Sequence, residues 1–416
     1  MSPPAIEPTQ NRQEDPTLTT SQPFNYESLF AENVPVTTRT AAPRTKYDFA
    51  VAYPAPETLP LNELADSLRD ALAREGDELA YYPHPAGMPA LREFVADKLA
   101  RDRDIHVTSD EIVLTSGSGE AIGMLIQAMT NKGDVLLTEE FVYLGTLRQM
   151  RRYGAEVVGI KCDDQGMIPG DLDTTINRLQ GEGKTIKFLY TIPAFQNPLG
   201  FTMPLERRQQ ILDIAQKYTL PIFEDDCYVD LRFEGEDVTS IHALAGGDGV
   251  LYTGSFSKIV APGMRLGYLV APEQVMQRAM SFKSPSGVNQ FAALAIEEFL
   301  KRDMYSHIGD QNETLRIKRD AMLAALGENF GDSAKWSVPE GGLYIWLEMP
   351  EGVDLAAIQE QAFNEGVGYF NGTQFSPDGR GANQARLCFG HPTPAIISEG
   401  IAELARIFTK HGVMGG

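Results

Sequence analysis

The stretch of sequence that decides the fold is Gly254-Ser255-Phe256-Ser257-Lys258-Ile259-Val260-Ala261-Pro262-Gly263-Met264-Arg265-Leu266-Gly267-Tyr268. The hydroxyls of Ser255 and Ser257 can donate to phosphate oxygens, and Arg265 adds a planar, permanently charged guanidinium. Lys258 lies between these groups and carries an amine that can condense with an aldehyde. A lysine after two serines is also typical of a solvated loop. Together, these groups predict a site for a cofactor that bears both an aldehyde and a phosphate.

Apolar segments on both sides of this stretch, 250–253 and 266–270, predict strands of a buried sheet. Such flanks place Lys258 on a loop at the core, where burial favours the neutral amine over the cation. The neutral amine is the nucleophilic form of lysine, so burial favours covalent chemistry over a solvated loop.

Composition limits the class of protein. A chain of 416 residues with 43% hydrophobic residues can bury a large core and predicts one large domain with one or two smaller ones. The formal net charge of -21 argues against a nucleic-acid partner, because phosphate binding needs clustered Lys and Arg. Cys162, Cys227 and Cys388 show no zinc or disulfide spacing, which predicts a reducing compartment. Residues 1–45 lack a basic start and a long apolar run, so we expect a cytoplasmic protein with no membrane partner.

The chain divides into three predicted parts. Residues 1–45 form a flexible tail and arm, in which Phe24, Tyr26, Leu29 and Phe30 can dock on the body or on a partner subunit. Residues 46–285 form a large domain, whose N-terminal part also contributes to the small domain. Residues 286–416 supply linking helices and a small C-terminal α+β domain.

Helices and short apolar strands alternate through the large domain. Amphipathic helices are predicted over 61–74 and 88–101, and strands over 134–138, 156–160, 186–191, 220–224, 250–253 and 266–270. This alternation predicts a mostly parallel sheet with helices on both faces. Two long helices, one ending near residue 300 and one spanning 304–326, then lead to strands near 341–347 and 385–389, and 375–384 is expected to be an exposed loop.

Pyridoxal 5′-phosphate (PLP) combines the predicted aldehyde and phosphate, and ligands bind at the strand ends of such sheets. Asn197 follows one strand and can hydrogen-bond the ring oxygen, although Asn-Pro is also typical of a plain turn. Asp225 follows the next strand and can pair with the pyridine nitrogen, while Tyr228 can reach the ring oxygen. Glu224, Asp225 and Asp226 can alternatively hold a divalent cation or form a solvated turn. Because no His accompanies them, no metal is predicted.

Three further positions suit the same cofactor. The turn Thr115-Ser116-Gly117-Ser118-Gly119-Glu120-Ala121 lets backbone N–H groups approach a phosphate at a helix N-terminus, and Ser118 adds a hydroxyl. Tyr143 can stack on the cofactor ring or be an ordinary core tyrosine. Arg386 lies in an apolar strand, where burial requires an anionic partner, and the α-carboxylate of a substrate is the natural one.

The ordered set resembles the fold type I PLP-dependent aminotransferases of class I/II, and its members are Ser118, Tyr143, Asn197, Asp225, Tyr228, Ser255, Ser257, Lys258, Arg265 and Arg386. Three motifs resemble the branch of 2-aminoadipate and kynurenine aminotransferases and the aminotransferase-like domains of MocR-type regulators. They lie at 81–92, 224–226 and 339–346, within a likeness that spans about 48–410. The resemblance implies an α/β fold with a large domain, a mostly parallel seven-stranded sheet and a small α+β domain.

The resemblance also implies roles for the site residues. Lys258 binds the cofactor aldehyde and shuttles the substrate proton, Asp225 pairs with the pyridine nitrogen, and Asn197 and Tyr228 hold the ring oxygen. The implied phosphate ligands are Ser118, Gly119, Ser255, Ser257 and Arg265. Tyr143 stacks on the ring, and Arg386 with Asn197 binds the substrate. Tyr82 reaches the cofactor phosphate of a neighbouring subunit, which implies a homodimer with shared sites.

Departures from the family pattern concern the substrate. Gly119 stands where this branch often has Gln, Ala52 stands where a glycine usually lies beside the substrate carboxylate, and Asn371-Gly372 stands where Pro-Gly is common. Ala52 narrows the space beside Arg386, and Tyr53 is expected to line the side-chain pocket.

Three functions are compatible with these residues. The leading one is transfer of the amino group of an L-amino acid to a 2-oxo acid such as 2-oxoglutarate. An alternative is elimination, cyclisation or oxidation of an amino acid on the same fold. A PLP-sensing regulator is a third, but residues 1–45 are too few and too poor in basic side chains for a DNA-binding module.

Overall fold

The computed structural model describes residues 24–30, 36, 44–283 and 287–415. The chain divides into two compact units, Met1–Arg39 and Thr40–Gly416. The described part of the first unit contains one short 3-10 helix, Glu27–Leu29, and exposes Phe24, Tyr26, Leu29 and Phe30. Docking of this arm therefore stays a prediction, and most of the predicted tail lies outside the described residues.

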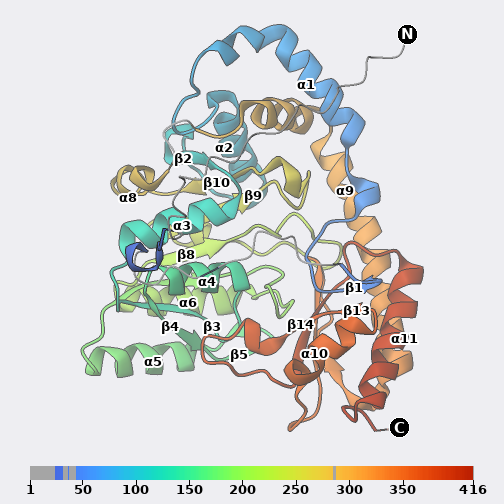
Figure 1. The fold of residues 1–416 in the computed structure, drawn as a ribbon. Helices are drawn as coiled ribbons and strands as arrows, with labels where there is room; N and C mark the ends of the chain where they lie inside the picture. Colours follow the sequence, from blue (N-terminus) through green and yellow to red (C-terminus); the bar gives the residue numbers. More distant parts are fainter. Residues whose placement is uncertain (1–23, 31–35, 37–43, 284–286, 416) are drawn as a thin grey trace, which may run out of the picture. The chain divides into compact units, whose positions relative to one another are not determined.

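A seven-stranded sheet forms the centre of the second unit, with strand order β2-β10-β9-β8-β7-β3-β4 (Figure 1). The strands are β2 (Ile112–Thr115), β3 (Val135–Glu139), β4 (Glu156–Ile160), β7 (Ile186–Thr191), β8 (Ile222–Asp225), β9 (Val250–Ser255) and β10 (Gly267–Val270). Neighbours pair in parallel except that β10 is antiparallel to both β2 and β9. The predicted α/β fold with a mostly parallel sheet is confirmed.

Alternate strand residues pack on opposite faces of this sheet. Leu136 and Phe223 join one hydrophobic cluster, which includes residues of α2 (Pro89–Arg103) and α3 (Ser118–Met129). Leu137 and Ile222 join the other cluster, with residues of α5 (Pro169–Gly181) and α6 (Leu205–Lys217). Both faces are therefore covered, which explains why the central strands are continuous apolar runs in the sequence.

The C-terminal part contains a four-stranded sheet of order β11-β12-β15-β14. Its strands are β11 (Lys335–Trp336), β12 (Tyr344–Glu348), β14 (Phe370–Asn371) and β15 (Gln384–Cys388), accompanied by α10 (Leu355–Asn364) and α11 (Pro394–Lys410). The N-terminal strand β1 (Tyr47–Asp48) pairs with β13 (Val367–Gly368). Each predicted domain thus holds one of the two larger sheets, and the boundaries after residues 45 and 285 stay predictions.

The remaining elements complete the second unit. They are η2 (Pro56–Thr58), α1 (Leu61–Glu75), η3 (Gly76–Ala80), η4 (Ser109–Glu111), α4 (Leu144–Arg152), the hairpin β5 (Cys162–Asp163) and β6 (Gly166–Met167), α7 (Ile241–Leu244), η5 (Pro262–Met264), α8 (Glu273–Ala279), η6 (Met280–Phe282), η7 (Gly331–Ser333) and η8 (Gly372–Gln374). Among the described residues, no helix has the length and apolar content needed to cross a bilayer.

One expectation about helices is wrong. The two helices predicted after residue 286 are a single helix, α9 (Gln290–Phe330), which packs against α1 and α11 (Figure 1). Leu300 and Met304 are both buried on one face of this helix, so the predicted gap between them is packed as helix. Lys301 and Arg302 between them form i,i+4 ion pairs with Glu297 and Glu298.

The expected exposed loop at 375–384 also needs correction. Phe375 and Ser376 are buried, and the loop reaches the surface only from Asp378 to Arg380. The ring of Phe375 packs against Trp346 and Phe370, so it anchors the loop to the four-stranded sheet.

Close backbone packing joins β10 to the start of α3. A Cβ atom added at Gly267 would lie 2.8 Å from both the backbone N of Ser118 and the carbonyl O of Gly254, and 2.9 Å from the carbonyl C of Gly117. These neighbours are backbone atoms that cannot move aside as a flexible side chain does. The glycine therefore sets the position of the α3 N-terminus on the sheet.

We expect Gly267→Ala to lower the free energy of unfolding by about 1–3 kcal/mol, because overpacking forces backbone shifts. The displaced α3 N-terminus should also weaken binding of a phosphate-bearing ligand. Urea unfolding and a ligand titration measure the two effects. Gly263→Ala is the matched control, because a Cβ there meets nothing within 4 Å. Equal stability of the two variants would contradict this account of the packing.

Candidate active site

A cavity of about 390 Å³ opens at the carboxyl ends of the strands of the large sheet. Strands β2, β3, β7, β8 and β9 all end beside it, so the loops that follow them supply its walls. The predicted site residues that line it are Ala52, Ser118, Gly119, Tyr143, Asp225, Tyr228, Ser255, Ser257, Lys258, Arg265 and Arg386.

Lys258 extends its amine into this cavity. Nζ donates a hydrogen bond to the carbonyl O of Ala52 at 2.8 Å. The pKa of Lys258 lies below its ordinary value because burial disfavours the ammonium form, and the nearby cations Arg386 and Arg265 act in the same direction. The amine is thereby biased toward its neutral, nucleophilic form.

Helix α9 holds the backbone of the lysine loop. Nε2 of Gln311 donates to the carbonyl O of Lys258 at 2.7 Å. Nε2 of His307 lies 2.6 Å from the carbonyl O of Ile259 and must donate to it, because a carbonyl oxygen can only accept. These contacts fix the start of the Lys258 side chain relative to the large sheet.

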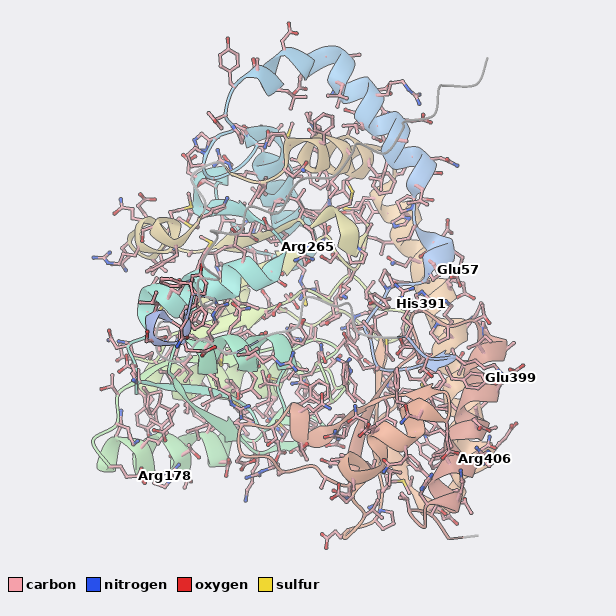
Figure 2. The ribbon with its side chains drawn as sticks, in the orientation of Figure 1. Glu57, Arg178, Arg265, His391, Glu399 and Arg406 are labelled. Atoms are coloured by element: carbon pink, nitrogen blue, oxygen red, sulfur yellow. The ribbon has the colours of Figure 1, made fainter. Side chains whose placement is uncertain are left out.

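Hydroxyl, amide and guanidinium groups gather at one end of the cavity. Helix α3 begins at Ser118 beside the cavity, and Gly117 precedes it with φ of 82°, a conformation that favours glycine. Arg265 donates through Nη2 to the carbonyl O of Ser116 at 2.8 Å, and Figure 2 labels its position. A Cβ at Gly117 would lie 2.6 Å from that Nη2, so the glycine also lets the arginine approach. Together with Ser255 and Ser257, these groups can bind a phosphate.

Asp225 provides the buried negative charge. It ends β8 and is 2% exposed, and its Oδ2 accepts a hydrogen bond from the Tyr190 hydroxyl at 2.6 Å. Oδ1 is buried and has no hydrogen-bond partner among the described residues. Burial raises the pKa of Asp225 to about 6, while the hydrogen bond from Tyr190 and the polar groups of Cys227 act in the opposite direction.

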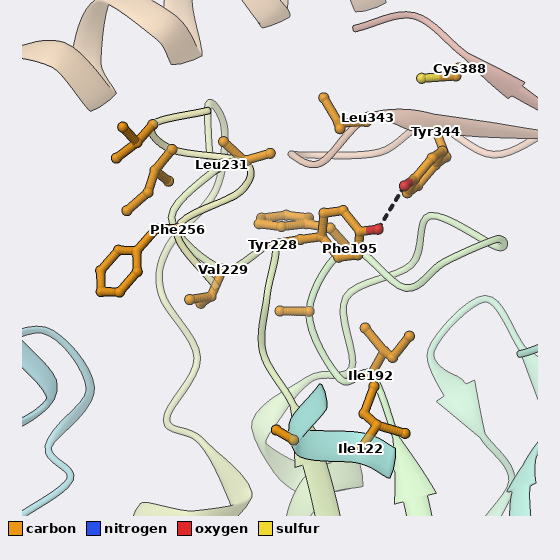
Figure 3. Close-up of a cluster of buried hydrophobic side chains, with 14 of the residues drawn as sticks. Ile122, Ile192, Phe195, Tyr228, Val229, Leu231, Phe256, Leu343, Tyr344 and Cys388 are labelled. Carbon is orange, nitrogen blue, oxygen red and sulfur yellow. Dashed lines mark hydrogen bonds between the residues drawn. The ribbon is translucent and has the colours of Figure 1, made fainter. Parts of the chain in front are cut away.

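Asn197 links two parts of the site. Its Nδ2 donates to the hydroxyl oxygens of Tyr228 at 3.1 Å and Tyr344 at 3.3 Å, while its Oδ1 accepts from Nη1 of Arg386 at 2.9 Å. The two tyrosine hydroxyls share a further hydrogen bond of 2.7 Å (Figure 3). A group held by Asn197 and Tyr228 is therefore placed in fixed relation to a group held by Arg386.

Arg386 is 3% exposed and enclosed by aromatic rings. Its guanidinium carbon lies 4.6, 5.2 and 5.0 Å from the ring centres of Tyr344, Phe370 and Phe375. Nη2 donates to the carbonyl O of Ala50, and Nε is buried without a hydrogen-bond partner in the described structure. A buried cation with a free N–H is a site for a carboxylate.

Three predicted site residues do not line this cavity. Asn197 contacts it through Tyr228 and Arg386, whereas Tyr82 and Tyr53 lie apart from it. Tyr82 is 89% exposed and lines a separate hollow with Pro83 and His84. Tyr53 follows Ala52, but its ring lies against His391 with 5.7 Å between ring centres, rather than lining a substrate pocket; Figure 2 labels His391. The carbonyl O of Ala52 accepts a hydrogen bond from Lys258, whereas the side chain of the next residue, Tyr53, does not line the cavity.

The carboxylates at 224–226 have separate partners. Both oxygens of Glu224 accept backbone N–H groups of Ile241 and His242, and Oδ2 of Asp226 accepts from Tyr252 at 2.9 Å. Asp225 instead faces Tyr190. Among the described residues, no group of three or more His, Cys, Asp or Glu side chains is arranged to hold a metal ion.

Several cavity residues were not predicted as site residues. They include Val51, Leu144, Arg148, Ile192, Cys227, Phe370 and Phe375. Tyr344, within the motif at 339–346, contacts Asn197 and Tyr228 directly. The helical spacing of Leu144 and Arg148 after Tyr143 was the one sequence signal that could have placed them on the same face of α4.

Comparison with known proteins agrees with this geometry. Residues 50–404 match the family model described as aminotransferase class I and II. The chain belongs to the aminotransferase class I and II family. It is 35% identical to aromatic-amino-acid aminotransferase 1 of Thermococcus litoralis, over 85% of each chain. It is similar to the solved kynurenine aminotransferase of Pyrococcus horikoshii, with 32% identity, a TM-score of 0.83 and coverage of 88% and 91%. It is also similar to a multiple substrate aminotransferase from Thermococcus profundus, with 29% identity, a TM-score of 0.88 and coverage of 94% and 100%.

The chain is therefore a fold type I, PLP-dependent aminotransferase, with amino acids and 2-oxo acids as substrates. The cavity suits this cofactor. The unpaired Oδ1 of Asp225 is available to a ring N–H, and the start of α3 with Arg265 is available to a phosphate. Gly119 leaves room at that end, because a Cβ there would meet only Nε2 of Gln149, at 3.9 Å.

We expect Arg386→Ala to raise KM for an amino-acid substrate about tenfold or more, because a charge-assisted pair is lost. PLP retention should change little. Arg386→Lys is the matched variant, and we expect a smaller increase because it keeps the charge but loses the planar fork. Steady-state kinetics and a PLP titration separate the two effects. An unchanged KM with loss of PLP would instead make Arg386 a structural residue.

Proposed function

We propose that the enzyme transfers the amino group of an L-amino acid with a large apolar side chain to 2-oxoglutarate. The observation that carries this proposal is a neutral-biased lysine amine in one cavity with a buried carboxylate and a buried guanidinium. The wall near Arg386 contains Val51, Phe370 and Phe375, which favours apolar donors, aromatic ones included. Arg148 also lines the cavity and suits the second carboxylate of the acceptor.

Each residue has a proposed task. Arg386 binds the substrate α-carboxylate, and Asn197 ties that position to Tyr228 and the ring oxygen. When bound, PLP supplies a ring that takes up negative charge from the substrate Cα. Nζ of Lys258 removes the Cα proton and later returns a proton, which requires the neutral amine that burial favours. Asp225 keeps the pyridine nitrogen protonated.

The test follows each half of the reaction by absorbance. With PLP bound, an aromatic L-amino acid should convert the visible chromophore to the near-ultraviolet amine form in a single turnover, and 2-oxoglutarate should reverse it. We expect 2-oxoglutarate to act faster than pyruvate, and Arg148→Ala to remove that difference. Steady product formation with no 2-oxo acid and no amine form would refute amino-group transfer in favour of elimination, cyclisation or oxidation.

We also propose a homodimer with shared active sites. Tyr81 and Tyr82 are 72% and 89% exposed, and Phe291 and Tyr305 are exposed as well. Exposed aromatic side chains of this size are common at subunit interfaces. Because Tyr82 does not line the cavity of its own chain, it is available to the cavity of a second copy.

Mixed dimers test the crossing directly. One chain carries Lys258→Ala and the other Tyr82→Phe. If Tyr82 acts on the partner site, one site has both defects and the other has neither, so activity should be about half that of the wild type. If Tyr82 acts within its own chain, activity should fall to half that of the Tyr82→Phe dimer. Tyr81→Phe in place of Tyr82→Phe is the matched control.

We infer that the enzyme works in a reducing, cytoplasmic setting. Cys162, Cys227 and Cys388 are all free in the structure. Burial raises the pKa of Cys227 and of Cys388 above the ordinary value, which keeps both groups as unreactive thiols.

A further inference from the structure

A chain of buried hydroxyls ends on Asp225. Oγ1 of Thr146 donates to the Tyr190 hydroxyl at 3.2 Å, and that hydroxyl donates to Oδ2 of Asp225 at 2.6 Å. Thr146 and Tyr190 are both 0% exposed. The two donors come from different elements, because Thr146 lies on α4 and Tyr190 on β7 beside β8. Water does not compete for these bonds at such burial.

Packing fixes the direction of the Tyr190 hydroxyl. Its ring meets the ring of Phe223 edge-on, with 5.6 Å between centres and 77° between planes. Burial and the charge of Asp225 both raise the pKa of Tyr190 well above its ordinary value. The phenol therefore stays protonated and acts as a donor.

The neutrality of this donor matters for the other oxygen of Asp225. A cationic partner such as arginine would cancel the carboxylate charge, whereas a phenol stabilises the charged form and leaves the negative charge in place. Oδ1 is left without a partner among the described residues, and Asp225 lines the cavity. The arrangement thus occupies one oxygen with a neutral donor and keeps the other for a cation.

We propose that Tyr190, supported by Thr146, is a positioning residue that holds Asp225 charged and oriented so that its free oxygen keeps the cofactor ring nitrogen protonated. This inference rests on the proposed role of Asp225 at that nitrogen. Tyr190 is a buried residue of β7, and its position in the strand alone does not indicate a role at the cofactor.

The experiment uses the full-length enzyme loaded with PLP labelled with ¹⁵N in the ring, whose chemical shift distinguishes a protonated from a neutral ring nitrogen. In Tyr190→Phe we expect the signal to move toward the neutral form. We also expect the PLP dissociation constant to rise about tenfold, because a hydrogen bond to a charged group is lost. Neither readout depends on which reaction the enzyme catalyses.

Tyr252→Phe is the matched control. Tyr252 is also a buried phenol of the same sheet, and it donates to a carboxylate, Oδ2 of Asp226, at 2.9 Å. Its loss should leave the ring-nitrogen signal in place. Thr146→Val should move the signal in the same direction as Tyr190→Phe but by less, and Thr146→Ser should restore it, which keeps the proposal testable even if Tyr190→Phe does not fold.

Asp225→Asn distinguishes a failure of the proposed role of Asp225 from a failure of the inference about Tyr190 and Thr146. If it leaves the ring nitrogen protonated, the proposed role of Asp225 itself fails. If Asp225→Asn moves the signal but a folded Tyr190→Phe and Thr146→Val do not, only the inference about the hydroxyl chain is overturned. It is equally overturned if Tyr252→Phe moves the signal as much as Tyr190→Phe.

Discussion

Lys258 places its amine where the structure offers it a carbonyl oxygen rather than a carboxylate, and this constraint shapes the rest of the site. Two other buried lysines show the usual solution, since Lys98 meets Asp230 and Lys318 meets Glu57, each at 2.7 Å. Among the described residues, no carboxylate forms an ion pair with Lys258, and Arg386 and Arg265 repel its charged form. These surroundings favour the neutral amine, which is the form that condenses with an aldehyde.

The remaining charges are kept apart around this amine. Asp225 lies at the end of β8, Arg265 lies beside the α3 N-terminus, and Arg386 lies in β15 of the other sheet. Tyr190 holds Asp225 and leaves its Oδ1 without a partner, and Asn197 holds Arg386 and leaves its Nε without a partner. Arg265 lies beside the backbone N–H groups at the start of α3. A ligand with a cationic ring nitrogen, a phosphate and a neighbouring carboxylate matches this separation of charge. Asn197 hydrogen-bonds both Tyr228 and Arg386 and so links these two residues of the cavity.

Much of the fold could be predicted because strands buried on both faces are continuous apolar runs. In the large sheet, the predicted strands agree with the observed ones within about two residues. Most site residues could be predicted because they follow those strands. The predictions that failed concern features that depend on side-chain contacts in the folded chain. The continuity of α9 goes with the burial of Leu300 and Met304, and Phe375 is buried partly against Trp346 of β12. The contact of Tyr190 was not predicted, because its partner Asp225 is set by the pairing of β7 with β8.

Borohydride reduction of the PLP-loaded protein, followed by peptide mass mapping of the modified lysine, tests the role of Lys258 most directly. We predict one reduced adduct per chain, on Lys258. We do not expect burial of an amine to be sufficient for this reaction. Nζ of Lys283 is buried and has no hydrogen-bond partner in the described structure, but Lys283 lies outside the cavity. Recovery of the adduct on Lys283 or any other lysine, with Lys258 unmodified, would contradict the account.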